Sequence, residues 1–571
     1  MFNMDYSVLS DYYNKLESVS SKLKKTEILA ELFKKTPSGE LGDVVLLVSG
    51  RVFPSFSQLE LGVARQMLIK AISKASGFSE KDVEEKFKKT GDLGLAAEQC
   101  FHSKKQTTLW KKKLTISSVF ENLKKLPFVS GGGSQGKKLN LISELLVSAN
   151  PQGSKYIVRT ILGELRVGVA EGLIRDAIVD AFLLEPKMSK EKKDEVTDLV
   201  DYSWNLLSDY GQIAVIAKEK GIDDLKKVKV QLGNPIQVML AEKAETIKEI
   251  IGKYGRVEIE TKYDGMRAQI HKKKNKIWIF TRRLEDVTAQ FPDLVELCVK
   301  GLKPEECIVE GEVLAIDKKN NSPLPFQMLS QRVQRKYDIE EMADQIPIQM
   351  NLFDILYIDG KMLFDKPLIE RRKILEEQIK IIPKKFQLAS CLVTDDLKKA
   401  EKFYKDALAE RQEGIMIKIL NSTYVFGRHV DGWIKIKPVM ETLDLIIIGA
   451  TWGEGTRANW LTSYLLACKD TKSDKFLEVG MMSTGLTEEE YKTMTSTLKP
   501  LITDEKGRTV KVKPKIVIEV KYQEIQKSPT YESGFALRFP ALKGIRFDKG
   551  PEDVDTMERV KKLYESQGRA G

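Results

Sequence analysis

The sequence predicts a multidomain protein of α and α+β class, in which a helical region, a strand-rich region and a small β-barrel follow one another along 571 residues. Apolar residues recur at helical spacing as far as about Gly221. Glycine and proline end that pattern at residues 232–236, and alternating apolar and polar residues follow to about Pro438. From Asp444 onward, short alternating runs separated by turn residues are typical of a barrel. We therefore expect domains at residues 1–232, 233–438 and 439–571.

Length and composition define the broad class of protein. A chain this long is expected to hold several cores, since domains of about 150 residues are usual. Lys and Arg number 93 against 82 Asp and Glu, and the net charge of +11 favours a polyanionic partner. The 5 cysteines are scattered without a Cys-x-x-Cys pair, so neither a zinc ribbon nor a disulfide framework is indicated. We expect a reducing interior, no signal peptide and no membrane span.

The first region combines helix-like patterns with basic residues. Helical periodicity is found over residues 7–33, 58–73, 139–148, 155–162, 172–182 and 189–207. A glycine-rich segment at residues 130–138 is expected to form a flexible loop. Arg159, Arg166 and Arg175 lie near predicted helix ends, where arginines and exposed backbone amides suit phosphate contacts. The equally weighted alternative is the solvated face of an ordinary helical bundle.

A short stretch of the same region, Lys104-Lys-Gln-Thr-Thr-Leu-Trp110, has the composition of a docking peptide. Leu109 and Trp110 would fill a pocket on a partner protein, and Gln106 would form hydrogen bonds beside them. The competing interpretation is that Leu109 and Trp110 are simply buried in the first domain.

The stretch from Val257 to Arg267 begins as an alternating strand. Glu260 and Lys262 share one face, because side chains two residues apart in a strand point the same way. Asp264-Gly265 is a turn signal before a second alternating run at residues 268–280, so the pattern predicts a hairpin with Lys262 just before its turn. A strand lysine beside carboxylates is a candidate covalent nucleophile, although a surface ion pair is the commoner role for one such motif.

Other strands of the middle region repeat this pattern of polar side chains on one face. Shared faces are expected for Glu310 with Glu312, for Phe353 with Ile355 and Tyr357, for Met416 with Lys418, and for Lys435 with Lys437. Each alone is an ordinary half-buried strand. Together they offer carboxylates for a divalent cation, lysines for a polyphosphate, an aromatic ring for a base, and a nucleophile.

In this order and spacing, the motifs resemble the covalent nucleotidyltransferase superfamily, and within it the ATP-dependent DNA ligases. The Lys-x-Asp-Gly element is Lys262-Tyr-Asp-Gly265. The further elements are Thr281-Arg-Arg-Leu-Glu-Asp286, Glu310-Gly-Glu312, Phe353-Asp-Ile-Leu-Tyr357, Glu413-Gly-Ile-Met-Ile-Lys418, Trp433-Ile-Lys-Ile-Lys437, Arg538-Phe-Pro540 and Arg546-Phe-Asp-Lys-Gly-Pro-Glu-Asp553. The first region is similar to the DNA-binding domain of the replicative type, chiefly through Lys155-Tyr-Ile-Val-Arg159 and residues 161–168. The resemblance covers nearly the whole chain and is strongest to the archaeal form.

The resemblance implies a helical DNA-binding domain, an adenylation domain of antiparallel sheets with helices, and a C-terminal OB-fold barrel. It implies that Lys262 is the catalytic nucleophile and that Glu312 and Glu413 bind a metal ion. Contacts with ATP are implied for Glu260, Arg267, Arg282, Glu312, Phe353, Lys418, Arg428, Lys435, Lys437 and Arg546. Contacts with DNA are implied for Lys155, Arg159 and Arg166, and contacts with a sliding clamp for Gln106, Leu109 and Trp110.

The reaction implied by the resemblance has three steps. Lys262 attacks the α-phosphate of ATP to form lysyl-AMP, AMP passes to the 5′-phosphate at a nick in duplex DNA, and the 3′-hydroxyl displaces AMP. Mg²⁺ or another divalent cation would offset the charge of the triphosphate. We expect a monomer that works with the sliding clamp in DNA replication, repair and recombination, in the cytoplasm and associated with the nucleoid.

Other classes of protein compete with this interpretation. RNA ligases and GTP-using capping enzymes share Lys-x-Asp-Gly, but the large helical region and the Arg-Phe-Pro element favour a DNA ligase. An NAD-dependent ligase should carry a cysteine-rich zinc module, which the scattered cysteines cannot supply. A non-catalytic scaffold that binds nucleic acid would have no need of Lys262 together with Glu312 and Glu413.

Overall fold

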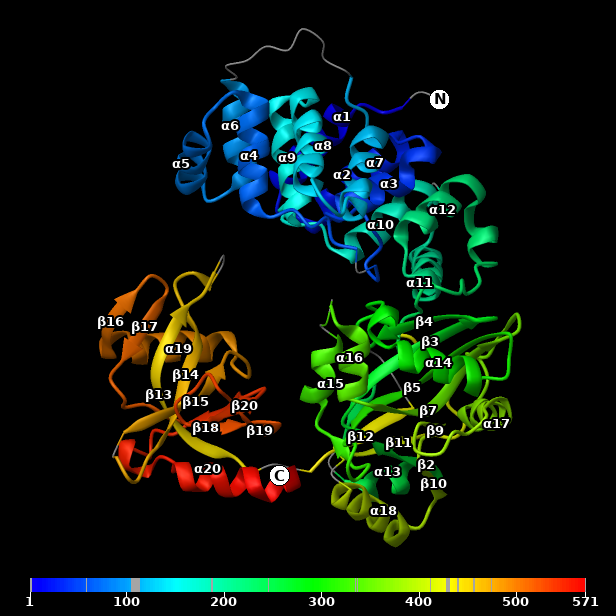
Figure 1. Cartoon of the computed structure of the whole chain (residues 1–571), viewed down its shortest axis with the longest axis vertical. Helices are drawn as coiled ribbons and strands as arrows, with labels where there is room; N and C mark the ends of the chain where they lie inside the picture. The colour runs from blue at the N-terminus through cyan, green and yellow to red at the C-terminus, as the bar shows by residue number, and fades with distance from the viewer. Residues whose placement is uncertain are drawn as a thin grey trace. The chain divides into compact units, whose positions relative to one another are not determined.

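The computed structural model describes residues 3–57, 59–103, 113–185, 188–244, 246–333, 335, 337–410, 412–427, 432–438, 441–454, 457–473 and 475–569 (Figure 1). The chain divides into two compact units. The first unit comprises Met1–Glu242, Asp264–Ser390 and Lys418–Trp433, and the second comprises Lys243–Tyr263, Cys391–Ile417 and Ile434–Gly571. The strand-rich region predicted at residues 233–438 therefore contributes to both units.

The first unit begins with a helical domain, coloured blue to teal in Figure 1. Its helices are α1 (Tyr6–Glu17), α2 (Lys22–Lys35), α3 (Ser38–Val48), α4 (Arg65–Ser76), α5 (Glu80–Thr90), α6 (Leu93–His102), α7 (Ile116–Lys125), α8 (Ser134–Ser148), α9 (Pro151–Leu162), α10 (Glu171–Phe182), α11 (Lys190–Leu207) and α12 (Tyr210–Leu225). Polar side chains cap the N-termini of several of them: the side chains of Ser21 and Asn150, for example, accept backbone N–H groups of α2 and α9. The helical prediction is confirmed, although the helix expected over residues 7–33 is broken between α1 and α2.

These helices bury their apolar faces in a core of their own. Leu9, Phe33, Ile142 and Ile157, from four different helices, are completely buried in it. A core that spans this region is typical of a domain that folds independently. None of the described helices combines the length and apolar composition needed to cross a lipid bilayer.

The rest of the first unit is built on a sheet that we call the Arg267 sheet. Its strands run in the order β4-β3-β5-β7-β8, with β6 beside β5 and β9 beside β7. Antiparallel pairing predominates, as the resemblance implied, although β9 is parallel to β7. The elements are β3 (Met266–Lys273), β4 (Lys276–Thr281), α14 (Pro292–Gly301), β5 (Glu306–Ile316), β6 (Pro323–Leu324), α15 (Phe326–Val333), α16 (Ile339–Gln345), β7 (Ile348–Ile358), β8 (Lys361–Met362), α17 (Leu368–Gln378) and β9 (Phe386–Leu388). Val309 and Met350 pack with Leu294 of α14 and Leu375 of α17, which leaves the opposite face of the sheet polar.

The second unit contains a smaller sheet, which we call the Lys262 sheet. Its strand order is β1-β12-β11-β2-β10. The elements are β1 (Glu242–Lys243), α13 (Ile247–Tyr254), β2 (Val257–Lys262), β10 (Cys391–Thr394), α18 (Leu397–Ala409), β11 (Gly414–Lys418) and β12 (Trp433–Ile436). Ile259 and Ile415 pack against Ile250 of α13 and Ala400 of α18. The alternate residues of β2, including Lys262, therefore lie on the other face.

The hairpin predicted between residues 257–262 and 268–280 is wrong. β2 pairs with β10 and β11, whereas β3 pairs with β4 and β5 in a different sheet. A Cβ atom on Gly265 would lie 2.4 Å from the carbonyl oxygen of Val313, so only glycine fits there. The Asp264 carboxylate accepts the N–H of Phe326, the first residue of α15, at 3.4 Å. Asp264-Gly265 thus fixes the entry of the chain into the Arg267 sheet rather than a hairpin turn.

The C-terminal part of the second unit is a closed β-barrel, which confirms that prediction. β13 pairs with β14 and β18, β14 pairs with β15, and β18 pairs with β21. The ring closes where Thr484, just after β15, bridges Ala541 of β21. The elements are β13 (Leu443–Trp452), β14 (Leu461–Lys469), β15 (Phe476–Met482), α19 (Glu488–Leu498), β16 (Ile502–Lys506), β17 (Thr509–Val512), β18 (Val517–Lys521), β19 (Glu524–Lys527), β20 (Phe535–Arg538), β21 (Ala541–Ile545) and α20 (Met557–Tyr564).

Candidate active site

Lys262 ends β2 and forms an ion pair with Glu413. Its Nζ lies 2.5 Å from Glu413 Oε2, and the Nζ of Lys437 lies 2.6 Å from the same oxygen. Backbone pairing fixes this arrangement, because the Glu413 N–H donates to the Lys262 carbonyl oxygen at 2.9 Å. Glu260 is buried and shares the polar face of β2 with Lys262. The predicted nucleophile therefore lies in a cluster of lysines and carboxylates.

Glu413 carries the charge that holds this cluster together. Burial alone would raise the pKa of Glu413, but the ion pairs with Lys262 and Lys437 lower it to about 2. The carboxylate is therefore ionised at neutral pH, between two ammonium groups. Because an amine attacks only when it is neutral, Lys262 must lose a proton before it can react.

Arg267, on the polar face of the Arg267 sheet, is held by three groups. Its Nη2 donates to Glu310 Oε2 at 2.7 Å, and its Nη1 donates to the Met239 carbonyl oxygen at 2.6 Å. A third bond of 3.3 Å runs from Nη2 to the hydroxyl of Tyr424. Burial would lower the pKa of Arg267, but the negative charge of Glu310 raises it. The guanidinium is thus permanently charged and fixed in orientation.

Phe353 and Trp433 form an aromatic pair beside this arginine. Their ring centres are 5.7 Å apart and the ring planes are nearly perpendicular, at 82°. The Nζ of Lys418 lies 4.5 Å from each ring centre, and the Arg267 guanidinium lies 5.6 Å from Phe353 and 5.1 Å from Trp433. Two cations against two buried rings suit a ligand that combines a flat base with negative charge.

Glu312 lies between two hydrogen-bond donors in the Arg267 sheet. The backbone register places Arg267 of β3 opposite it on one side and Asn351 of β7 on the other. Asn351 is completely buried, and its Oδ1 accepts the amides of Gln349 and Gln387 at 2.9 and 3.1 Å. Within the described residues, its Nδ2 has no acceptor. Across β3, β5 and β7, the half-buried carboxylate of Glu312 is therefore flanked by residues that carry N–H groups.

The remaining predicted residues are more dispersed. Lys435 is half-buried on β12, and Arg282 is exposed in the turn after β4. Arg546 lies in the barrel, where it pairs with Asp444 at 3.2 Å and Asp548 at 2.7 Å. Arg428 and the predicted docking residues Gln106, Leu109 and Trp110 lie outside the described residues.

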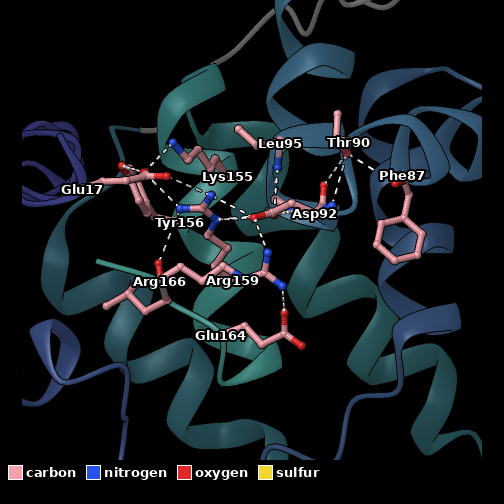
Figure 2. A network of polar contacts seen from close by, with 12 residues as sticks. Glu17, Phe87, Thr90, Asp92, Leu95, Lys155, Tyr156, Arg159, Glu164 and Arg166 are labelled. Carbon is pink, nitrogen blue, oxygen red and sulfur yellow. Dashed lines mark hydrogen bonds and ion pairs between the residues drawn. The ribbon is translucent and has the colours of Figure 1, made fainter. Parts of the chain in front are cut away.

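The three basic residues predicted to contact DNA belong to one network of polar contacts (Figure 2) but differ in exposure. Lys155 pairs with Glu17 at 2.7 Å, and Arg159 pairs with Glu17 at 3.1 Å and Asp92 at 2.8 Å. The side chains of Lys155 and Arg159 are only 7% and 4% exposed, whereas that of Arg166 is 48% exposed. A phosphate can reach Arg166 as it stands, but contact with Lys155 or Arg159 requires those buried ion pairs to break.

The predicted set omitted Tyr424, Glu310 and Trp433, all of which contact Arg267. Glu310 had a usable signal, because its spacing of two residues from Glu312 places it on the same face. Trp433 had one too, since it opens the strand of Lys435 and Lys437. Tyr424 had none, because it lies in an irregular segment whose contacts are distant in the sequence.

Known proteins resemble the chain over its whole length. Three family models match in order: "DNA ligase N terminus" at residues 5–179, "ATP dependent DNA ligase domain" at residues 238–437, and "ATP dependent DNA ligase C terminal region" at residues 457–549. A protein of Nanoarchaeum equitans named DNA ligase is 45% identical over 572 residues, which cover 99% of each chain. The chain belongs to the ATP-dependent DNA ligase family.

Further relatives of this ligase are also archaeal. The DNA ligase of Thermococcus onnurineus is 45% identical over 570 residues, covering 100% of this chain and 99% of the relative. That of Archaeoglobus fulgidus is 40% identical over 565 residues, covering 99% of each. A solved structure named "Pmar-Lig_PreS3" covers 94% of this chain and 99% of its own, with a TM-score of 0.54 and 16% identity, and so shares the fold. Family membership confirms the predicted order of domains and the choice of a DNA ligase over an RNA ligase, a capping enzyme or a scaffold.

Proposed function

We propose that Lys262 carries the AMP in the reaction of this ligase. Its neutral amine would attack the α-phosphorus of ATP, forming a P–N bond as pyrophosphate leaves. The AMP would pass to the 5′-phosphate of a nick and leave when the 3′-hydroxyl attacks. The observation that carries the proposal is the 2.5 Å ion pair of Lys262 with Glu413. It supports the role because it holds the amine in one position while leaving the side chain 22% exposed to a ligand.

The other predicted residues would bind the nucleotide and the phosphates of DNA. Phe353 would stack on adenine, Glu260 would contact the base or ribose, and Lys418 would contact the adenylate. Arg267 would hold a phosphate, the ribose or the 5′ end of the nick. The close approach of Lys418 and Arg267 to the ring of Phe353 supports this assignment. Phosphate contacts are assigned to Arg282, Arg428, Lys435, Lys437 and Arg546.

A divalent cation, Mg²⁺ in the simplest case, would be held by Glu312 and Glu413. In the part of the chain that the structure describes, no three His, Cys, Asp or Glu side chains gather as metal ligands. This fits Mg²⁺, which usually takes only one or two protein carboxylates together with phosphate oxygens and water. Glu413 already holds two ammonium groups through one oxygen and thus readily accepts cations. When bound, the cation would neutralise part of the negative charge of the phosphates.

Duplex DNA would be bound through its backbone, because a ligase must act on any sequence. Of the three residues predicted to contact DNA in the helical domain, only the exposed Arg166 is retained in this proposal, because Lys155 and Arg159 are buried in ion pairs. We place the domain limits at residues 1–232, 233–438 and 439–571. Each of the three family matches, at residues 5–179, 238–437 and 457–549, falls within one of these ranges, which supports the limits.

In the cell, the enzyme would act as a monomer in replication, repair and recombination, in the cytoplasm at the nucleoid. We assign a sliding clamp as its partner, bound through Gln106, Leu109 and Trp110. The support for the clamp is the sequence alone, in which an apolar pair follows a glutamine within a lysine-rich stretch.

Incubation with ATP labelled in the α-phosphate tests the central proposal. The wild type should become covalently labelled, and Lys262→Ala should not. The variant should still seal part of a pre-adenylated nick, because the lysine is not the nucleophile of the third step. Lys300→Ala, which removes an exposed lysine of α14, serves as the control and should label normally. If Lys262→Ala were labelled at the wild-type rate, Lys262 would not be the nucleophile.

A further inference from the structure

Tyr424 lies in the irregular segment between β11 and β12, and its position is fixed from several sides. Its backbone N–H donates to the Phe364 carbonyl oxygen at 2.9 Å. Its ring contacts those of Phe364, Phe426 and Trp433, with centres 6.2, 5.6 and 6.1 Å apart. The side chain is buried, so the ring can neither rotate away nor exchange its contacts for water.

The hydroxyl of Tyr424 is at the centre of a hydrogen-bond network. It accepts the Met239 N–H at 2.9 Å and donates its proton to Glu310 Oε2 at 3.0 Å. The same carboxylate oxygen accepts Arg267 Nη2 at 2.7 Å. Burial, together with the charge of Glu310, raises the pKa of Tyr424 well above 10, so the hydroxyl keeps the proton that it donates. A single oxygen thus links the segment before β2 with β3 and β5.

Arg267 depends on this network for its orientation. Both of its terminal nitrogens are used, Nη1 by the Met239 carbonyl and Nη2 by Glu310 and Tyr424. Its Nε is buried and, within the described residues, has no acceptor. A buried donor without an acceptor is unfavourable in a protein interior. The protein therefore holds the guanidinium through three of its five N–H groups and, within the described residues, leaves the N–H of Nε and the second N–H of Nη1 for a ligand oxygen.

We propose that Tyr424 is a positioning residue for ATP binding: it holds Arg267, through Glu310 and Met239, in the orientation in which the guanidinium meets a nucleotide oxygen. This inference rests on the proposed contact between Arg267 and the nucleotide. Tyr424 itself touches no reacting atom. Removing its hydroxyl leaves Glu310 and the Met239 N–H each without one partner, and Arg267 loses one of its three hydrogen bonds and keeps those to Glu310 and the Met239 carbonyl.

Tyr424→Phe tests this role, because it removes one oxygen and keeps the ring. The KM for ATP in self-adenylation should rise about tenfold, the equivalent of one lost hydrogen bond to a charged group. The labelling rate at saturating ATP should stay near that of the wild type. Tyr464→Phe is the matched control, since Tyr464 is also buried and its hydroxyl donates to the Leu461 carbonyl of the barrel. Its KM for ATP should not change, even where its melting temperature falls as much.

Arg267→Leu separates the two levels of the inference. If Arg267→Leu and Tyr424→Phe both raise the KM for ATP, the positioning role stands. If only Arg267→Leu raises it, Arg267 binds the nucleotide but Tyr424 is structural, and the inference is overturned. If neither variant raises the KM for ATP, the proposed contact of Arg267 with the nucleotide is wrong, and the positioning role of Tyr424, which rests on it, is wrong with it. The inference would also be overturned if Tyr424→Phe only slowed labelling, in proportion to a smaller fraction of folded protein, without a change in the KM for ATP.

Discussion

At Glu413, one carboxylate oxygen binds both the predicted nucleophile and a predicted phosphate-binding lysine. Lys262 and Lys437 therefore compete for the same negative charge. A ligand that draws Lys437 toward phosphate, or a cation that occupies the carboxylate, changes the ion pair of Lys262 as well. A single residue can thus make the reactivity of the lysine depend on whether the nucleotide is present.

His271 makes the stability of the protein depend on pH. The residue is completely buried; its Nδ1 accepts the Gly233 N–H at 3.2 Å, so its Nε2 carries the proton that Gln269 accepts at 3.0 Å. Burial lowers the pKa of His271 to about 3. In the unfolded chain the imidazole takes up a proton near pH 6.5, whereas in the folded chain it stays neutral. The contribution of His271 to the free energy of unfolding is therefore complete above pH 6.5 and is lost as the pH falls from 6.5 to 3. We expect a loss of about 1.4 kcal/mol from this group between pH 7.5 and 5.5.

Urea unfolding of the wild type and His271→Asn at these two pH values measures this loss. The pH dependence of the variant should be smaller by that amount, because Asn has no proton to gain. Equal pH dependence in the two proteins would show that His271 is not kept neutral by the fold.

At the scale of single elements, strong local patterns predicted structure well. The pattern over residues 155–162 became α9, and the pattern over residues 189–207 became α11. Pairing between strands was not predictable in the same way. Alternation showed that residues 257–262 and 268–280 are strands but not which strands they join, because partners are chosen by contacts distant in the sequence. The expected loop at residues 130–138 was wrong in part, since α8 begins at Ser134.

β7 shows how one irregularity changes the side chains that a face presents. The expectation that Phe353 and Ile355 share a face is wrong: Ile355 packs in the core behind the sheet, whereas Phe353 contacts Arg267 and Lys418. The pairing of β5 with β7 shifts register on either side of Val309 and Glu310. A bulge inserts an extra residue and inverts the alternation that follows. Nothing in the local sequence of β7 indicates where the shift falls.

The candidate site was predictable where its residues lie on regular strands. Glu260 with Lys262, and Glu310 with Glu312, follow from a spacing of two. The contacts that orient Arg267 were not predictable, because they come from segments far apart in the chain. Tyr424 and Met239 are 185 residues apart, and no periodicity connects them.

The ion pairs of Arg159 join α1, the start of α6 and α9. Removing this arginine should therefore lower the stability of the helical domain. Figure 2 shows the guanidinium of Arg159 between Glu17 and Asp92. Arg159→Ala would leave a buried Asp92 without its main counter-ion, so we expect a loss of about 3–5 kcal/mol in the free energy of unfolding. Chemical denaturation of the two proteins measures it.

Arg166→Ala is the matched comparison. Because Arg166 is half exposed, its removal should change stability by less than about 1 kcal/mol while weakening binding to nicked DNA and reducing its salt dependence. Arg159→Ala should bind DNA normally per folded molecule. If Arg159→Ala weakened DNA binding per folded molecule and Arg166→Ala did not, Arg159 rather than Arg166 would be the DNA contact.

At the scale of the whole molecule, the predicted clamp contact would act by tethering. A ligase bound to a clamp on DNA searches for nicks at a high effective concentration. Replacing Leu109 and Trp110 together by Ala should weaken clamp binding by about 2–4 kcal/mol if they are its anchors. Ligation without the clamp should stay near normal. A large drop in melting temperature with unchanged clamp affinity would show that the pair belongs to the core of the first domain.

The division of the middle region between the two units has a consequence for synthesis on the ribosome. The helical domain has its whole core once residue 225 has emerged. β2, in contrast, pairs with β10 and β11, and the sheet is completed only by β12, some 170 residues later. At about 5–20 residues per second, β2 waits roughly 10–30 s with unpaired edges. We therefore expect the nascent middle of the chain, rather than either end, to be the stretch most exposed to aggregation during synthesis.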